Sequence, residues 1–181
     1  DILEREVPIT EENPEKSKKG LYKIKDNYIR FWFAFVYPNM SFIESGNSGI
    51  VMKKIRSSLV SGHIAFVYED VCRERMWELN GEDRWPFHFS KIGRWWDGKN
   101  EIDIAAIDPD GKNLILGECK FWHEPVGVNI FNDLVEKSKS VTWKKADRHT
   151  WYVLFSAEGF TDELKTLAQS RGDLLLFDDI N

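Results

Sequence analysis

The chain is poor in the residues that mark several classes of protein. Only two of its 181 residues are cysteines, Cys72 and Cys119, and they stand far apart with no metal-ligand spacing around them. Two reduced thiols of a cytosolic protein are therefore expected. The four histidines likewise show neither zinc-site nor catalytic-triad spacing, so we expect them to lie on the surface or to pack.

Long apolar runs and an excess of positive charge are also missing. No apolar stretch approaches the roughly 18 residues of a membrane-spanning helix, and no signal peptide opens the chain. We therefore expect a cytoplasmic protein without a membrane partner. The net charge is −5 at pH 7, whereas a protein that coats nucleic acid would be basic, so any contact with DNA must come from a local patch.

The hydrophobic residues, 42% of the chain, suffice for one well-buried domain with an appendage. The first 25 residues predict a strand, a charged loop and a second strand. Asp26 is expected to cap a short helix that Pro38 ends. Two further helices are predicted over residues 49–59 and 63–79, separated by a break at Ser61-Gly62.

Strands and helices alternate in the rest of the chain. Strands are predicted over 89–96, 101–108, 113–122, 150–156 and 173–178. Helices are predicted over 128–138 and from Thr161 to Gly172. With the preceding helix, the order is helix, three-strand meander, helix, strand, helix, strand. This order predicts an α/β fold with a mixed central sheet.

The stretch EIDIAAIDPDGKNLILGECKFW, residues 101–122, puts three charges where a core is otherwise being built. A turn about Asp110-Gly111 sets a register in which residue 105 faces 116 and residue 103 faces 118. Alternation then places Asp103, Glu118 and Lys120 on one face. That face also carries Ala105, Ile107, Leu114 and Leu116, and the opposite face carries Ile102, Ile104, Ala106, Ile115, Gly117, Cys119 and Phe121.

In this register, the Cβ atoms of Asp103 and Glu118 would lie roughly 5 Å apart. Two buried carboxylates so close need compensation: one can take a proton, Lys120 can form a salt bridge, or a divalent cation can bind between them. Mg²⁺ or Mn²⁺ held there would polarise a phosphodiester and activate water. Lys120 would orient that water and offset the developing charge. The pattern fits a metal-assisted phosphodiesterase.

The spacing Asp103 … Glu118-Cys119-Lys120 resembles the PD-(D/E)XK nuclease superfamily. The resemblance implies a restriction-endonuclease-like core in which Asp103, Glu118 and Lys120 are catalytic. The superfamily also has an acid on its first helix, and Glu69 in FVYEDVCRERM matches that position. Glu69, Asp103 and Glu118 would then bind the metal.

Two points stay open in this resemblance. Asp70 and Glu74 lie on the same predicted helix and could serve in place of Glu69. The residues before Asp103 are Glu101-Ile102, where the superfamily often has a proline.

A wider resemblance covers nearly the whole chain. The segments VPITEENPEKSKKGLYKIKDNYIRFWFAFVYPN, IGRWWDGKNEIDIAAID and ILGECKFW look like the C-terminal region of archaeal and bacterial DEXX-box P-loop ATPases. In these proteins an ATPase domain and a winged helix precede a domain called DUF234. The resemblance implies that residues 1–46 are a winged-helix remnant, namely a wing hairpin and a connecting helix, and that residues 47–181 are the nuclease-like domain. No Gly-x-x-x-x-Gly-Lys-[Ser/Thr] motif occurs, so ATP would bind only in an N-terminal domain absent here.

Plainer explanations stand beside these assignments. Asp103, Glu118 and Lys120 could form a structural ion cluster, and Glu101, predicted opposite Lys120, would then neutralise the lysine. Candidate nucleic-acid contacts are Arg94, Trp96 and Lys137. Core packing is the alternative for at least one of the tryptophans at positions 95 and 96, and a solvated helix face is the alternative for Lys137.

Two functions therefore compete. The first is a Mg²⁺-dependent nuclease module that cleaves or binds DNA. The second is an inactive nuclease fold that regulates the ATPase, for which Lys120 would be bonded to Glu118 or Glu101 and divalent ions would not bind. The implied partners are DNA and the ATPase and winged-helix domains of the same protein. Self-association into an oligomer through the exposed aromatic start is a third possibility.

Overall fold

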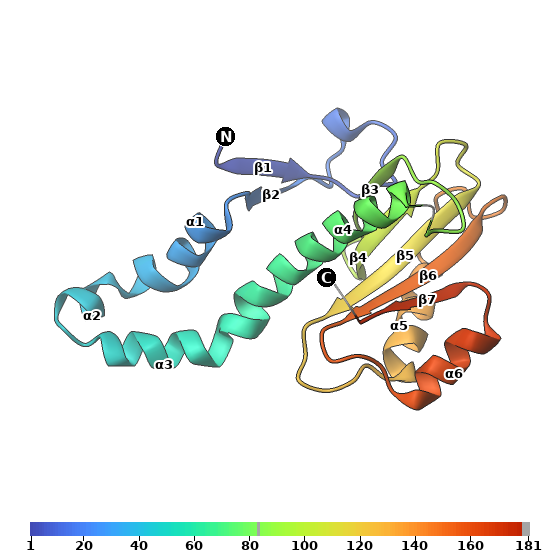
Figure 1. The fold of residues 1–181 in the computed structure, drawn as a ribbon. Coiled ribbons are helices and arrows are strands. Elements are labelled where there is room, and N and C mark those ends of the chain that lie inside the picture. Colours follow the sequence, from blue (N-terminus) through green and yellow to red (C-terminus); the bar gives the residue numbers. More distant parts are fainter. Residues whose placement is uncertain (83, 179–181) are drawn as a thin grey trace.

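The structure, a computed structural model, describes residues 1–82 and 84–178 (Figure 1). Within these ranges, five strands form one sheet in the order β3-β4-β5-β6-β7. The strands are β3 (Lys91–Trp96), β4 (Glu101–Ile107), β5 (Asn113–Lys120), β6 (His149–Ser156) and β7 (Leu174–Phe177). The first three form an antiparallel meander, whereas β6 and β7 run parallel to β5. The predicted mixed sheet and element order are confirmed.

Helices cover both faces of this sheet. Helix α4 (Ala65–Gly81) packs on one face, and α5 (Val128–Ser138) and α6 (Asp162–Ser170) pack on the other (Figure 1). The parallel strands require this arrangement, because each crossover from β5 to β6 and from β6 to β7 must return the chain along a helix. Thr161 caps α6 as predicted, since its hydroxyl accepts the backbone N–H of Leu164.

The register of the β4–β5 hairpin is the predicted one, with Ala105 paired to Leu116 and Ile104 to Gly117. Alternation holds for most of both strands: Leu116 packs toward α5 and α6, and Ile104 packs toward α4. The prediction for Ile102 is wrong, because this side chain packs with Ala105 in the cluster beneath α5 and α6.

A bulge on β4 explains the reversal at Ile102. From Gly93 to Trp95, β3 advances two residues, whereas β4 advances three from Ala105 to Ile102. The extra residue lies in the Asp103-Ile104 segment, and a β-bulge of this kind turns the following side chains to the other face. The bulge therefore sits at the first predicted site residue.

The N-terminal part is a hairpin followed by a helical arm that extends away from the sheet (Figure 1). Strands β1 (Leu3–Glu6) and β2 (Leu21–Ile24) pair antiparallel. The helices of the arm are α1 (Asn27–Phe31), α2 (Met40–Glu44) and α3 (Ser48–Leu59). Asp26 caps α1 as predicted, since its carboxylate accepts the N–H of Ile29 at 2.9 Å.

Two predicted interruptions of the arm are wrong. Pro38 falls within a 3₁₀ turn, Tyr37–Asn39, and helical structure resumes at once in α2. Proline is tolerated there because it stands in the first turn, where its missing N–H has no partner to lose. Ser61-Gly62 lies in a π-helical turn, Val60–Ile64, that joins α3 to α4 without a break. Such turns bend a helix without ending it.

Both cysteines are free, as expected, and both are buried. Among residues 1–82 and 84–178, no helix combines the length and the hydropathy that a membrane crossing requires.

Candidate functional site

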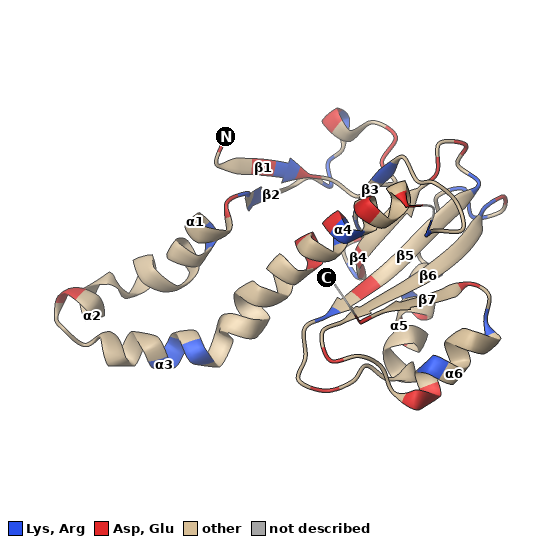
Figure 2. Cartoon of the chain, viewed as in Figure 1, with Lys and Arg blue, Asp and Glu red and all other residues tan. Residues whose placement is uncertain are grey.

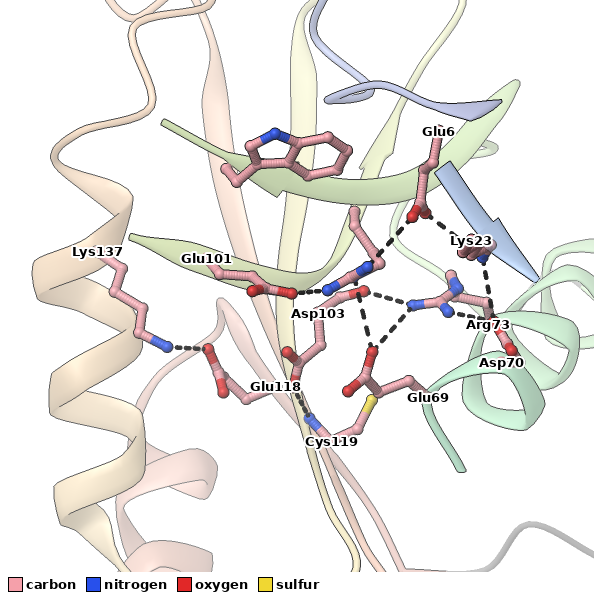
Figure 3. A network of polar contacts seen from close by, with 12 residues as sticks. Glu6, Lys23, Glu69, Asp70, Arg73, Glu101, Asp103, Glu118, Cys119 and Lys137 are labelled. Carbon is pink, nitrogen blue, oxygen red and sulfur yellow. Dashed lines mark hydrogen bonds and ion pairs between the residues drawn. The ribbon is translucent and has the colours of Figure 1, made fainter. Parts of the chain in front are cut away.

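The site begins where β4 and β5 separate. Their recorded pairing ends at Ile104 and Gly117. One step beyond, the backbone N–H of Cys119 donates to the Asp103 carboxylate at 3.0 Å (Figure 3). The bulge in β4 thus turns the Asp103 side chain toward its neighbouring strand. The Asp103 carboxylate therefore lies at the open end of the hairpin, just beyond the Ile104–Gly117 pair.

Glu118 and Lys120 meet Asp103 at this opening. The Lys120 ammonium lies 2.5 Å from one Glu118 oxygen and 3.7 Å from an Asp103 oxygen. The other Glu118 oxygen accepts a bond of 2.6 Å from Lys137 on α5. Burial would lower the pKa of Lys120, but the Glu118 and Asp103 carboxylates outweigh it and raise that pKa. The structure therefore brings together two acids and a lysine that stays charged.

Helix α4 contributes the third acid. The Glu69 side chain is 12% exposed and lies 3.8 Å from both Arg73 and Arg94. The pKa of Glu69 is raised to about 7, first by burial and then by the Asp103 charge, while Arg94 and Arg73 act in the opposite direction. Asp70 is instead held by Arg73 at 2.5 Å. Of the acids on this helix, Glu69 is the one coupled to Asp103.

Asp103 lies between the other two acids, Glu69 and Glu118 (Figure 3). Burial raises the pKa of Asp103, and Glu118 raises it further. Lys120 and the Cys119 N–H act in the opposite direction without restoring the ordinary value. Because burial is the largest cause, the site disfavours a negative charge on Asp103, and it favours a proton or cation bound there.

Hard carboxylate oxygens are the ligands that Mg²⁺ and Mn²⁺ prefer. Asp103 and Glu118 offer such oxygens beside one another. Within residues 1–82 and 84–178, however, no three His, Cys, Asp or Glu side chains are placed to hold an ion together. The predicted three-ligand set is therefore not assembled in this arrangement, because Arg73 and Arg94 hold Glu69 on the α4 side.

Glu101 was expected opposite Lys120, and this prediction is wrong. Glu101 forms an ion pair with Arg94 on β3. The reason is the early end of the β4–β5 pairing, beyond which β4 pairs only with β3, where Glu101 stands opposite Trp96. Lys120 consequently has Glu118 as its near partner.

The candidate nucleic-acid contacts are placed as follows. Arg94 is largely buried among acids, with Glu6 at 3.2 Å. The Trp96 indole N–H donates to the backbone oxygen of Lys19 at 3.2 Å, and the Arg94 guanidinium lies over its ring. Trp95 is a core residue. Lys137 is bound to Glu118, so it belongs to the site whatever its role.

Sequence reasoning missed Arg73. It donates to the backbone oxygen of Asp103 at 2.7 Å and pairs with Glu69 and Asp70. Its position four residues after Glu69 on a helix was a usable signal, since residues at that spacing share a face. Glu6, far away in the sequence, offered no such signal.

Cavities flank the acids on two sides. One, of about 220 Å³, lies against Glu69, Arg73 and Arg94. Another, of about 450 Å³, lies between β5 and α5 and reaches Glu118, Lys120 and Lys137. The cluster can therefore be approached both from the α4 side and from the α5 side. Figure 2 shows how charges of both signs gather along α4 and the adjoining strands.

Fold and site together define a mixed α/β domain with a buried acid–lysine cluster at the open end of a β-hairpin. Comparison with protein families places it more closely. The chain belongs to the DUF234 family, described as archaea bacterial proteins of unknown function, whose model matches residues 32–139.

One curated relative is the uncharacterized protein MJECL04 of Methanocaldococcus jannaschii. It is 38% identical over 181 residues, which are 98% of this chain and 38% of the relative. The chain thus spans well under half the length of the relative it matches.

Solved structures overlap the chain in part. A repair endonuclease from Pyrococcus abyssi has a TM-score of 0.35 at 17% identity, covering 59% of this chain and 46% of its own. The EndoMS–dsDNA2 complex has a TM-score of 0.33 at 17% identity, covering 56% and 42%. A protein of unknown function, AF1548, has a TM-score of 0.35 at 22% identity, covering 60% and 56%. Overlaps this partial do not assign a function to the chain.

Proposed function

We propose that the chain carries a Mg²⁺- or Mn²⁺-dependent phosphodiesterase site that acts on DNA, in a domain of the restriction-endonuclease type. One observation carries the proposal: Asp103, Glu118 and Lys120 converge where β4 and β5 separate, and the Asp103 pKa is raised. An acid pair in which burial disfavours the charge of Asp103, beside a fixed ammonium, suits a divalent ion with a phosphate next to it.

The residues divide the work as follows. Asp103 and Glu118 would hold the ion, which when bound polarises the phosphate and acidifies a water molecule. Lys120, kept cationic by the two carboxylates, would orient that water and offset charge on the phosphate. Glu69 is the neighbouring acid on α4. With a pKa of about 7, it can give up its proton near neutral pH.

The test is cleavage of supercoiled and branched DNA by the purified protein with Mg²⁺ or Mn²⁺. Asp103→Asn and Lys120→Met are expected to reduce the rate about a hundredfold or more. The matched controls are Asp110→Asn and Lys91→Met, which change the same charges at exposed positions. If no DNA is cut, or if the control variants lose as much activity as the site variants, the proposal is wrong.

A second candidate is an inactive nuclease fold that serves as an interaction module. Its supporting observation is that each Glu118 oxygen is already bonded to a lysine, Lys120 or Lys137. Calorimetric titration with Mn²⁺ separates the two functions. Heat of binding that Asp103→Asn abolishes favours the phosphodiesterase, and no heat at all favours the interaction module.

The setting in a longer protein is also a proposal. By resemblance, residues 1–46 would be the wing and connecting helix of a winged-helix domain that follows a P-loop ATPase, with residues 47–181 as the nuclease-like domain. The ATPase and the winged helix would be partners within one protein. The assay is whether ATP changes DNA cleavage by the longer relative, and a rate independent of ATP would argue against coupling between the domains.

A further inference from the structure

Six charged side chains of alternating sign form a closed ring between the N-terminal hairpin and the site. In order around the ring they are Lys23, Glu6, Arg94, Glu69, Arg73 and Asp70, and Asp70 returns to Lys23 (Figure 3). The nitrogen–oxygen distances run from 2.5 to 3.8 Å. With three bases and three acids, the ring balances its own charge.

Arg30, on α1, stands outside this balance. It lines the same 220 Å³ cavity as five members of the ring and Phe66. Within residues 1–82 and 84–178, no acid lies at ion-pair distance from Arg30, and its recorded hydrogen bond goes to the backbone oxygen of Ile24 at 3.2 Å. The guanidinium therefore adds a positive charge that the protein itself does not neutralise.

The walls of the cavity carry a surplus of positive charge. Its charged residues are Lys23, Arg30, Arg73, Arg94, Glu69 and Asp70. Four cations and two acids line it, and because Arg94 is also paired with Glu6 and Glu101, the unpaired positive charge is that of Arg30. In addition, the Arg94 Nε atom is buried without a hydrogen-bond partner in the described part of the chain. Cationic forks around a cavity beside an acid cluster are a setting for a phosphate group.

We propose that this cavity binds a phosphate of the DNA strand next to the one that is cleaved. The proposal rests on the proposed function, since the anion is taken to belong to its substrate. Arg30 contacts the phosphate, and Arg94 turns to it from Glu6. Phe66, 42% exposed at the wall, offers a ring face on which the sugar or base can rest.

Glu6 of the N-terminal hairpin then competes with the DNA strand for Arg94. The Glu6 carboxylate lies 3.2 Å from Arg94, and it occupies a donor that the phosphate needs. Removing the Glu6 charge should therefore strengthen binding, whereas removing the Arg30 charge should weaken it. A change in net charge alone would shift binding in the same two directions, so the size of the Arg30 effect is compared with that of an exposed arginine.

Binding of a short labelled DNA duplex is measured by fluorescence anisotropy in EDTA, so that no cleavage is needed. Arg30→Gln is expected to weaken binding about tenfold and to lower the salt slope by about one. The matched control is Arg56→Gln, an exposed arginine on α3 outside the cavity, which should change binding less than about twofold. Glu6→Gln should tighten binding about threefold.

Arg30→Lys is the control for misfolding, because it keeps the positive charge and loses only the bidentate geometry of the guanidinium. It should recover part of the affinity, and melting curves should match across the variants. Equal losses in Arg30→Gln and Arg56→Gln would reduce the effect to general charge and overturn the proposal. Calorimetry with inorganic phosphate is the second arm. Phosphate binding that depends on Arg30 while duplex binding does not would assign the cavity to free phosphate instead.

The two proposals fail separately. Asp103 does not line the cavity, so duplex binding by Asp103→Asn in EDTA should still depend on Arg30. No cleavage with Arg30-dependent binding would reject the phosphodiesterase and keep the phosphate cavity. DNA cleavage together with duplex binding that does not depend on Arg30 would reject the phosphate cavity and keep the phosphodiesterase.

Discussion

Asp103 on β4 accepts the backbone N–H of Cys119 on β5 at 3.0 Å, just past the last recorded pair of that hairpin. A side chain here does what a strand carbonyl would otherwise do, because the bulge in β4 has moved the backbone away. The carboxylate is thereby fixed beside Glu118 and cannot turn to solvent. The position of the carboxylate follows from the local sheet geometry. Its raised pKa follows from burial and from the neighbouring Glu118 charge.

Asp103→Asn should leave the metal-free protein as stable or more stable at pH 7. The amide oxygen can still accept the Cys119 N–H, and the change removes a charge whose raised pKa shows that the fold disfavours it. A gain of about 1 kcal/mol in the free energy of unfolding is expected. Urea denaturation in EDTA measures it. A loss of several kcal/mol would mean that Asp103 serves chiefly to pair with Lys120.

With divalent ions, the unaltered protein should instead become more stable than Asp103→Asn. Mn²⁺ would stabilise the unaltered protein by an amount that grows with the logarithm of its concentration, and it would leave Asp103→Asn unchanged. Melting temperatures across a Mn²⁺ series record the difference, with Asp110→Asn as the control that should respond like the unaltered protein. Equal responses in all three proteins would place the ion elsewhere.

Stability should fall as pH rises toward 7 because of Glu69. Its pKa is about 7 in the folded chain against an ordinary value of 4.5, so the folded state holds the proton more tightly than the unfolded state. The favourable contribution is thus present below pH 4.5 and is lost as the pH rises through about 7. The loss is at most about 3 kcal/mol. Denaturation from about pH 5 to about pH 8 measures it.

Glu69→Gln should remove most of this slope. Some slope should remain, because the raised pKa of Asp103 acts in the same direction. Glu74→Gln, at an exposed position of the same helix, should keep the full dependence. A steep slope that survives in Glu69→Gln would assign the effect to another group.

The hairpin and its charges could be foreseen because their cause is local. Alternation and the turn near Asp110 fix the register, and the register brings Glu118 and Lys120 to the end where Asp103 lies. The bulge could not be foreseen, because it depends on how β3 pairs with β4. For that reason the side of Ile102 and the partner of Glu101 were both predicted wrongly.

Contacts between segments far apart in the chain also could not be predicted from the sequence. Glu6 and Arg94 are 88 residues apart, and neither has a sequence pattern that names the other. The break expected at Ser61-Gly62 failed for a related reason. Serine and glycine are poor helix formers in isolation, but they can be carried through a π-helical turn when the helices on both sides are held by their own contacts.

Lys137 and Lys120 should differ in what they control. Both bind Glu118, at 2.6 and 2.5 Å, but only Lys120 also lies near Asp103. Lys137→Met should raise Mn²⁺ affinity several-fold, because it frees a Glu118 oxygen from a competing cation. Lys120→Met should also permit binding but abolish cleavage. Calorimetry and the DNA assay on both variants check this, and cleavage that survives only in Lys120→Met would exchange the two roles.

Gly117→Ala should destabilise the fold without touching any charge. A Cβ at position 117 would stand 2.5 Å from a methyl group of Val153 and 3.0 Å from its backbone oxygen, with Ile104 at 3.2 Å on the other side. Neither neighbour can withdraw, because Gly117 is paired to Ile104 on β4 and to Val153 on β6. The expected cost is about 2 kcal/mol, or a fall of about 4–8 °C in melting temperature for a chain of this size.

The control for Gly117→Ala is Gly49→Ala in α3, where an added Cβ meets nothing within 4 Å. Alanine favours a helix, so this variant should melt at the same temperature or slightly higher. Because Gly117 precedes Glu118, any shift of β5 in Gly117→Ala should also weaken Mn²⁺ binding. If Gly117→Ala were as stable as the unaltered protein, β4, β5 and β6 would not be packed as closely as described.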